Sequence, residues 1–178
     1  TDVRELRRAK SDLETVYRAG RELSATESPL RLYDRILDIL LREFPAADVC
    51  SLHRAGPDGG LLCEAVRRRD PKRAGAEHPA FSHSVLQTVN REMKGVLAFD
   101  APTDGRFREN ESIQQLHIRS MMGVPLQSRG NRVGILQAST LEPDHRFYRN
   151  DLVLLTALGA IAGPVVENAL LLDSLKGE

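Results

Sequence analysis

Two thiols, Cys50 and Cys63, could support redox chemistry in this chain. Such chemistry needs a reactive thiolate and a second thiol that resolves the oxidised intermediate. Both cysteines fall in a predicted hairpin, where small buried residues are common. We therefore keep a redox enzyme that uses Cys50 or Cys63 as an alternative and expect no catalytic residue. Two cysteines are too few for a disulfide scaffold, which indicates a cytoplasmic protein.

Histidine could supply metal ligands, and the chain has five: His53, His78, His83, His117 and His145. None stands beside Cys, Asp or Glu at the spacing of a zinc site, so we predict no metal. A glycine-rich phosphate loop, a Gly-x-Ser-x-Gly turn and paired carboxylates are all absent from the sequence, so hydrolase or kinase chemistry has no support. We expect a protein that is not an enzyme.

The charge balance argues against a general attraction to nucleic acid or to anionic membranes. Lys+Arg and Asp+Glu both number 25, so the net charge is zero. The basic run 67–73 is interrupted by Asp70 and Pro71 and is typical of a solvated surface. The longest apolar stretch, 152–162, is shorter than the ~20 residues that cross a bilayer. We expect no direct nucleic-acid or membrane contact, and we expect an internal piece of a longer protein, because the chain opens on Thr1 without a leader-like segment.

Helical periodicity marks both ends of the chain. Residues 3–25 carry apolar positions at alternating spacings of three and four, and residues 150–175 repeat this pattern around Pro164, where we expect a kink. Each helix needs an apolar partner, so we predict a parallel dimer stalk. Its candidate interface residues are Leu6, Leu13, Val16, Leu23, Leu158, Val165 and Leu172.

Between these helices the sequence predicts a sheet with short helices. A helix begins at Ser28-Pro29 and ends at Pro45, and another runs from the cap Ser82 to Gly95. Strands are expected at 47–54, 61–67, 96–99, 121–126 and 132–141, with hairpin turns at 56–60 and 128–131, and Pro125 implies an edge position or a strand end. A loop covers 100–110 and a short helix 111–117. The pattern predicts an α+β fold with helices packed on an antiparallel sheet of five or six strands.

Several short motifs narrow this outline to one family. In order they are Ser82-His83-Ser84-Val85-Leu86, Val96-Leu97-Ala98-Phe99-Asp100-Ala101, Asp104-Gly105-Arg106-Phe107, Ser112-Ile113, Ile118 to Leu126, Val133-Gly134-Ile135-Leu136, Phe147, Asp151-Leu152 and Glu167 to Leu171. Over residues 20–172 this order resembles the GAF domain family, as found beside forkhead-associated, sigma-54-activator, cyclase and histidine-kinase modules. The resemblance implies a GAF core at 26–163, a signalling helix at 1–25 and a connector helix at 164–178.

The resemblance leaves the ligand open, because GAF domains bind diverse ligands or none. Cyclic-nucleotide members carry an Asn-Lys pair after the penultimate strand, where this chain has residues 138–140, Ala-Ser-Thr. Phe147 and Asp151 are retained and are interpreted as a buried anchor and a helix cap. Cyclic nucleotide therefore stays an open alternative. Covalent bilin is not expected because residues 100–120 lack cysteine, and heme, which could use His117, is disfavoured.

In the resembled family the ligand lies between the sheet and the loop and short helix that cover it. The candidate ligand-binding residues are Asp100, Asp104, Arg106, Glu111, Ser112, Gln115 and His117. A pocket needs only a few such polar groups. The alternative is that Asp100 and Asp104 satisfy turn backbone while Arg106 pairs with a carboxylate.

We therefore predict a small-molecule-binding sensory domain of a cytoplasmic, bacterial-type signalling protein. Transcription regulation is among the functions that we expect for such a protein. Its dimeric helices would relay the ligand state to a covalently linked output domain. One alternative is a ligand-free dimerisation and relay module. Another is a thiol-based methionine sulfoxide reductase, since some small GAF proteins reduce free methionine sulfoxide with a set of cysteines.

Overall fold

The computed structural model describes residues 2–24, 28–72, 82–107 and 117–177. Within them, five strands form one antiparallel sheet in the order β2-β1-β5-β4-β3. The strands are β1 (Val49–Ala55), β2 (Leu61–Arg68), β3 (Val96–Ala98), β4 (Ser120–Ser128) and β5 (Asn131–Thr140). The helices are α1 (Val3–Ser24), α2 (Pro29–Glu43), α3 (His83–Glu92) and α5 (Arg149–Lys176), with a 3-10 turn η1 at Ala101–Thr103. The predicted α+β fold is confirmed.

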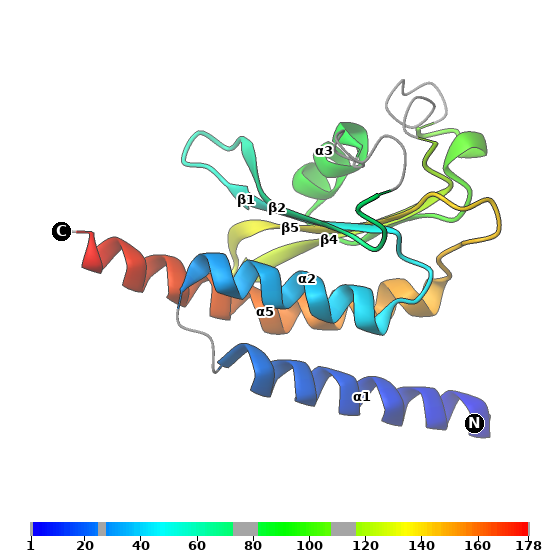
Figure 1. Ribbon diagram of the computed structural model, residues 1–178, viewed down its shortest axis with the longest axis horizontal. Helices are drawn as coiled ribbons and strands as arrows, with labels where there is room; N and C mark the ends of the chain where they lie inside the picture. The colour runs from blue at the N-terminus through cyan, green and yellow to red at the C-terminus, as the bar shows by residue number, and fades with distance from the viewer. Residues whose placement is uncertain (1, 25–27, 73–81, 108–116, 178) are drawn as a thin grey trace.

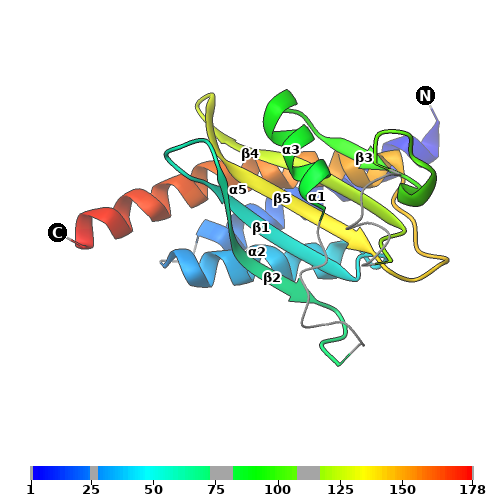
Figure 2. The ribbon, with the colours of Figure 1, turned by 90° about the horizontal axis from the view of Figure 1, so that it is seen from above.

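The sheet separates two unequal helical layers (Figure 1). The long helices α2 and α5 pack on one face, called the lower face here, and α1 lies outside them. In the described part of the chain, helix α3 lies on the opposite, upper face (Figures 1 and 2). The buried apolar residues form two corresponding clusters, a large one on the lower side and a smaller one around Val85, Leu86 and Val89 of α3.

Helix α5 comes unusually close to strand β4. A Cβ atom built on Gly163 would run into the backbone carbonyl of Gln127, and one on Gly159 would lie 3.3 Å from the carbonyl oxygen of Pro125. The helix passes through Pro164 without a break in its assigned range. Among the described residues, α5 is also the one helix whose length and composition would allow it to cross a membrane. Burial of Leu155, Leu158, Ala162 and Val166 in the lower cluster accounts for that composition.

Pro125 lies within β4, at a place where the strand has a single neighbour. Strand β3 pairs only with residues Met121 to Gly123, whereas β5 pairs along the whole of β4. Pro125 therefore occupies a local edge, as its missing N–H requires. The turn that follows uses Arg129 and Gly130, both with positive φ (53° and 80°), which is the geometry of a two-residue hairpin.

Two arginines of the basic run 67–73 bind the second helix. Arg67 forms ion pairs with Asp34 and Asp38 of α2. Arg69 donates hydrogen bonds to the carbonyl oxygens of Leu41 (2.7 Å), Phe44 (3.1 Å) and Ala47 (2.8 Å). The carbonyls of Leu41 and Phe44 end α2 and lack partners within the helix. Arg67 and Arg69 therefore connect the end of β2 to α2 and its C-terminal turn, and they do not form a free basic patch.

Helix α1 lies along α5 and runs in the same direction (Figure 1). Its inner face, with Thr15, Ala19 and Leu23, is buried inside this chain. Arg42 of α2 also bridges to Glu22, at 3.1 Å. The apolar seam of α1 is therefore divided between an inner face that packs within one chain and an outer face that remains exposed.

Candidate ligand-binding site

The upper face of the sheet carries four buried polar side chains on two adjacent inner strands, β1 and β5. Ser51 and His53 belong to β1, and Gln137 and Ser139 belong to β5; all four are at most 2% exposed. Strand alternation places them on the same face as Val49 and Ile135, which pack with α3. The register pairs Ser51 with Gln137, so the residues are neighbours across the strands. We call this group the polar floor: Ser51, His53, Gln137 and Ser139.

Part of the polar floor is without internal hydrogen bonds. One ring nitrogen of His53, Nε2, lies 2.9 Å from Oγ of Ser51. By contrast, Nε2 and Oε1 of Gln137 and Oγ of Ser139 find no partner among the described residues. A buried polar group without a partner costs roughly 1–3 kcal/mol. A floor built only for stability would carry apolar side chains here, as the lower face does with Leu52, Leu136 and Ala138.

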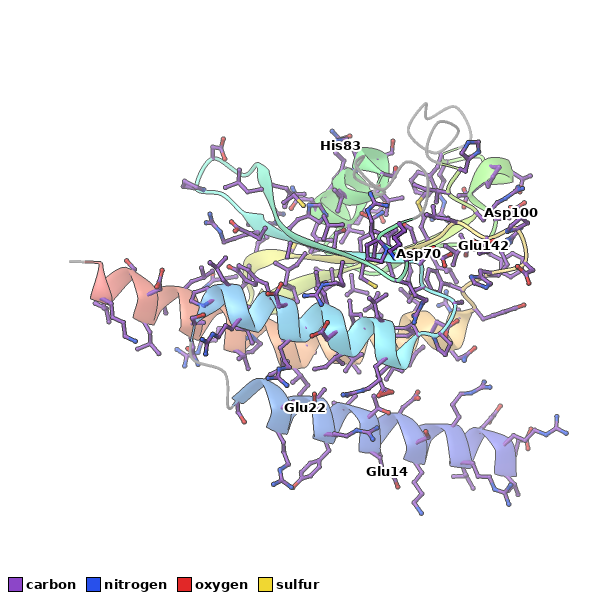
Figure 3. All side chains as sticks on the ribbon, in the orientation of Figure 1. Glu14, Glu22, Asp70, His83, Asp100 and Glu142 are labelled. Carbon is purple, nitrogen blue, oxygen red and sulfur yellow. The ribbon has the colours of Figure 1, made fainter. Side chains whose placement is uncertain are left out.

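A cavity of about 400 Å³ adjoins the floor between the β1–β2 hairpin and α3. Its lining includes His53 from the floor, Leu61 and Cys63 from β2, and Leu86 and Asn90 from α3. Figure 3 labels His83, a further lining residue, on α3 above the sheet. Oδ1 of Asn90 is buried and has no partner in the described part of the chain. The described lining contains no Lys, Arg, Asp or Glu.

The polar floor is electrically neutral. Burial lowers the pKa of His53 from 6.5 to about 4, and the nearby His83 adds a smaller effect in the same direction. His53 is therefore neutral at physiological pH and can act as donor through one ring nitrogen and acceptor through the other. Together with one amide and two hydroxyl groups, it offers hydrogen bonds of both senses without a net charge.

Asp104 and Arg106, two predicted ligand contacts, are bound to each other. Nε and Nη2 of Arg106 donate to the two carboxylate oxygens of Asp104, at 3.0 and 2.8 Å. Nη2 of Arg106 also donates to the carbonyl of Leu97 at 2.7 Å, and the guanidinium lies 4.9 Å from the ring centroid of Phe107. The hydrogen bond from Arg106 is the largest cause of a lowered pKa at Asp104. This geometry is the scaffold role that the sequence left as an alternative.

The other predicted contacts are dispersed. Asp100 accepts a hydrogen bond from the Thr103 hydroxyl at 2.7 Å and one from Arg146 at 3.5 Å, at the end of the upper side away from His83 (Figure 3). His117 is exposed and has a left-handed backbone, with φ of 57°. Glu111, Ser112 and Gln115, with most of the predicted short helix, lie outside the described residues.

The two cysteines lie on opposite faces of the sheet. Cys50 is buried in the lower cluster, and burial raises the pKa of its thiol to about 12. Cys63 is an exposed residue at the cavity. Its thiol is partly buried there, and this partial burial is the main cause of a raised pKa. Both are free. Because a raised pKa disfavours the thiolate and the sheet lies between the two residues, they are poorly arranged as a nucleophile and its resolving thiol.

The predicted stalk residues fall into two groups. Leu23 and Leu158 are buried in this chain's own core, and Val16 and Val165 are packed against it. Leu6, Leu13 and Leu172 remain exposed. Leu23 and Leu158 are therefore unavailable to a partner molecule unless the core opens, whereas Leu6, Leu13 and Leu172 are accessible.

The sequence model of the GAF domain family matches residues 28–165. The chain belongs to the GAF domain family. This match confirms the resemblance and spans everything from the cap of α2 to the middle of α5. GAF domains are commonly sensory or regulatory modules. Among curated proteins, no match is found.

Solved GAF domains share the fold at low sequence identity. A GAF domain from a phosphoenolpyruvate-protein phosphotransferase of Coxiella burnetii is 20% identical, with a TM-score of 0.72, over 93% of this chain and 98% of that one. Free methionine-R-sulfoxide reductase of Neisseria meningitidis, solved with its substrate, is 14% identical, with a TM-score of 0.69, over 90% and 91%. GAF3 from Slr1393 of Synechocystis, in its photoproduct state, is 18% identical, with a TM-score of 0.67, over 84% and 99%.

The polar floor was missed by sequence reasoning. Alternation along 132–141 predicts a strand, but Gln137 and Ser139 occupy positions that a one-sided sheet would expose to water. Only the placement of α3 and the upper cluster shows that these side chains are buried. Two polar residues at alternate positions of a central strand were the available signal.

Proposed function

We propose that this GAF domain is a ligand-binding regulatory module whose ligand occupies the upper face of the sheet. The observation that supports this proposal is the unpaired amide of Gln137, buried beside Ser51 and Ser139. Native proteins leave few buried polar groups unpaired, so each such group calls for an explanation. A ligand that completes the hydrogen bonds of Gln137 would recover free energy that the unliganded chain lacks.

The contacts between β4 and α5 give this site a physical route to the outside of the molecule. Gly123 of β4 pairs with Gln137, and four residues further along β4 the carbonyl of Gln127 meets Gly163 of α5. The hydroxyl of Ser128 also donates to Glu167 of α5 at 3.0 Å. We infer that ligand binding shifts α5 relative to β4 and so alters its last turns, where an output domain would follow. The ligand can change the equilibrium between the two arrangements of α5 only by the difference in its affinity for them.

We also propose that a second copy of the chain packs on the outer face of α1. This outer face consists of Val3, Leu6, Leu13 and Tyr17, each at least 57% exposed. Their spacings of three, seven and four residues form one continuous seam. Leu172 and Leu175 add exposed apolar surface near the end of α5. Since α1 and α5 run in the same direction, a parallel pair of α1 helices would place two α5 ends side by side.

Thermal-shift measurements test the ligand-binding proposal. The panel contains cyclic nucleotides, other nucleotides, amino acids, heme and biliverdin, and each is added to the purified chain and to two variants. A ligand at about 100 times its Kd should raise the melting temperature by roughly 5–10 °C. Gln137→Met should abolish the rise. Gln127→Met should preserve it, because the Gln127 amide already donates to the carbonyl of Met93.

A rise that both variants retain would place the ligand away from the polar floor. No rise with any compound would favour the alternative, a dimerisation and relay module that binds no ligand. The outer face of α1 supports that alternative equally well, because it does not depend on the upper face of the sheet.

A further inference from the structure

The amide of Gln137 limits the chemistry of any ligand that reaches it. A glutamine side chain presents an N–H donor and a carbonyl acceptor next to each other in one plane. A ligand group that satisfies both atoms must offer an acceptor adjacent to a donor. Carboxamides, lactams and nucleobase edges have this arrangement, and the bidentate pairing of Gln with adenine is an example.

The neighbours of Gln137 disfavour a charged group at the same place. Ser51 and Ser139 carry hydroxyls, and the ring of His53 is neutral at physiological pH because burial lowers its pKa. The described part of the adjoining cavity also contains no Lys, Arg, Asp or Glu. Among the described residues, no counter-charge lines the cavity for a carboxylate that faces Oε1 of Gln137, or for an ammonium or amidinium group that faces Nε2. Burying an unpaired charge is far more costly than burying a paired neutral group.

The polar floor meets the cavity at one residue, His53. His53 lines the cavity and contacts Ser51 at 2.9 Å, and Ser51 is the cross-strand partner of Gln137. Residues paired across antiparallel strands lie about 4.5–5.5 Å apart at Cα, so Gln137 is one side chain away from Ser51. Gln137 is only 1% exposed, so a ligand must displace what covers it.

We propose that the ligand contacts the sheet through an uncharged edge with adjacent hydrogen-bond donor and acceptor, which pairs with Gln137 and is flanked by Ser51 and Ser139. This inference rests on the proposed function, since it specifies the chemistry of the same site. It concerns the part of the ligand that contacts the polar floor. A carboxamide, a lactam or a nucleobase fits that description, whereas a carboxylate or an amidine does not.

Matched small molecules test this inference directly. One set consists of a carboxamide, its carboxylate and its amidine: benzamide, benzoate and benzamidine. A second set consists of the carboxamide nicotinamide and its carboxylate nicotinate. Binding is followed through the side-chain amide signals of the ¹⁵N-labelled chain, and the signals of Gln137 are assigned by their absence in Gln137→Met. Carboxamides should shift the Gln137 signals saturably and bind about tenfold or more tightly than their carboxylates, as expected for about one hydrogen bond.

Two variants make the test specific. Gln137→Met should remove the preference for carboxamides, and Ser139→Ala should weaken it if the first variant fails to fold. Gln127→Met should leave the preference unchanged. Tighter binding of the carboxylates or amidines would overturn the inference and leave the proposed ligand-binding function intact. The inference would also be overturned if no set binds, or if the preference for carboxamides survives in Gln137→Met. The thermal-shift panel tests the proposed function independently.

Discussion

Gln137 is a buried residue of the central strand whose side-chain amide lacks hydrogen-bond partners among the described residues. Its side chain is 1% exposed, and neither of its polar atoms has a partner among the described residues. The neighbouring strand β4 contributes Gly123 beside it, so no side chain from that strand can complete its hydrogen bonds. An unpaired buried amide costs free energy, and under the proposed function the same amide would pair with the ligand.

Removing this amide should stabilise the unliganded chain. Gln137→Met keeps a similar volume and deletes both unpaired groups, so we expect the free energy of unfolding to rise by about 1–2 kcal/mol. Urea denaturation followed by circular dichroism measures the change. The control Gln127→Met, which loses its hydrogen bond to Met93, should bring no gain. A loss of stability in Gln137→Met would mean that the native amide is satisfied and would count against the binding site.

His53 should make the stability of the domain depend on pH. Burial lowers its pKa from 6.5 to about 4, so the unfolded chain takes up a proton that the folded chain excludes. The contribution is fully present above about pH 6.5 and decreases as the pH falls toward about 4, by up to about 1.4 kcal/mol per pH unit. Urea denaturation at about pH 7.5 and about pH 5 measures this slope.

Two histidine variants identify the source of that slope. His53→Gln should reduce it, whereas His83→Gln, at an exposed position on α3, should keep it close to that of the unmodified chain. Equal slopes in His53→Gln and the unmodified chain would show that other groups cause the pH dependence.

At the scale of elements, α5 packs so close to β4 that only a glycine fits at position 163. Gly163→Ala would push a methyl group into the carbonyl of Gln127, and we expect a loss of about 1–3 kcal/mol. Gly20→Ala is the matched control, because its methyl would lie 3.7 Å from Ile161 in ordinary contact. It should gain about 0.5–1 kcal/mol from helix propensity. Equal effects of the two substitutions in urea denaturation would contradict the close contact.

At the scale of the whole molecule, the outer face of α1 is the surface that we expect a second copy to cover. The double substitution of Leu6→Lys and Leu13→Lys should halve the mass measured by light scattering and leave the circular dichroism spectrum unchanged, since both side chains are exposed. Leu62→Lys, at a half-exposed position on β2, should leave the mass of the dimer intact. A monomeric mass for the unmodified chain would remove the basis for the dimer proposal.

The sequence alone determined the elements whose signals are local. Ser28 accepts the backbone N–H of Arg31 and Ser82 that of Val85, as expected of helix caps, and Asp151 accepts the backbone N–H of Tyr148. Phe147 is fully buried, as expected from its interpretation as a buried anchor. Periodicity, turn residues and capping depend on neighbours within a few positions of the chain, so the α+β class, the strand order along the chain and the family could be read without coordinates.

Only the tertiary structure decided which polar residues have spare hydrogen-bonding capacity. Asp104 and Arg106 had the residue types of a ligand site, but they lie two residues apart and satisfy each other. The sequence predicted only a strand over 132–141, and packing on the upper face buries Gln137 and Ser139 of that strand without partners among the described residues. The apolar seam predicted for α1 is likewise divided by packing within the chain, which buries Leu23 and leaves Leu6 and Leu13 exposed. Burial and pairing are set by residues distant in the chain, and a single sequence carries no local record of them.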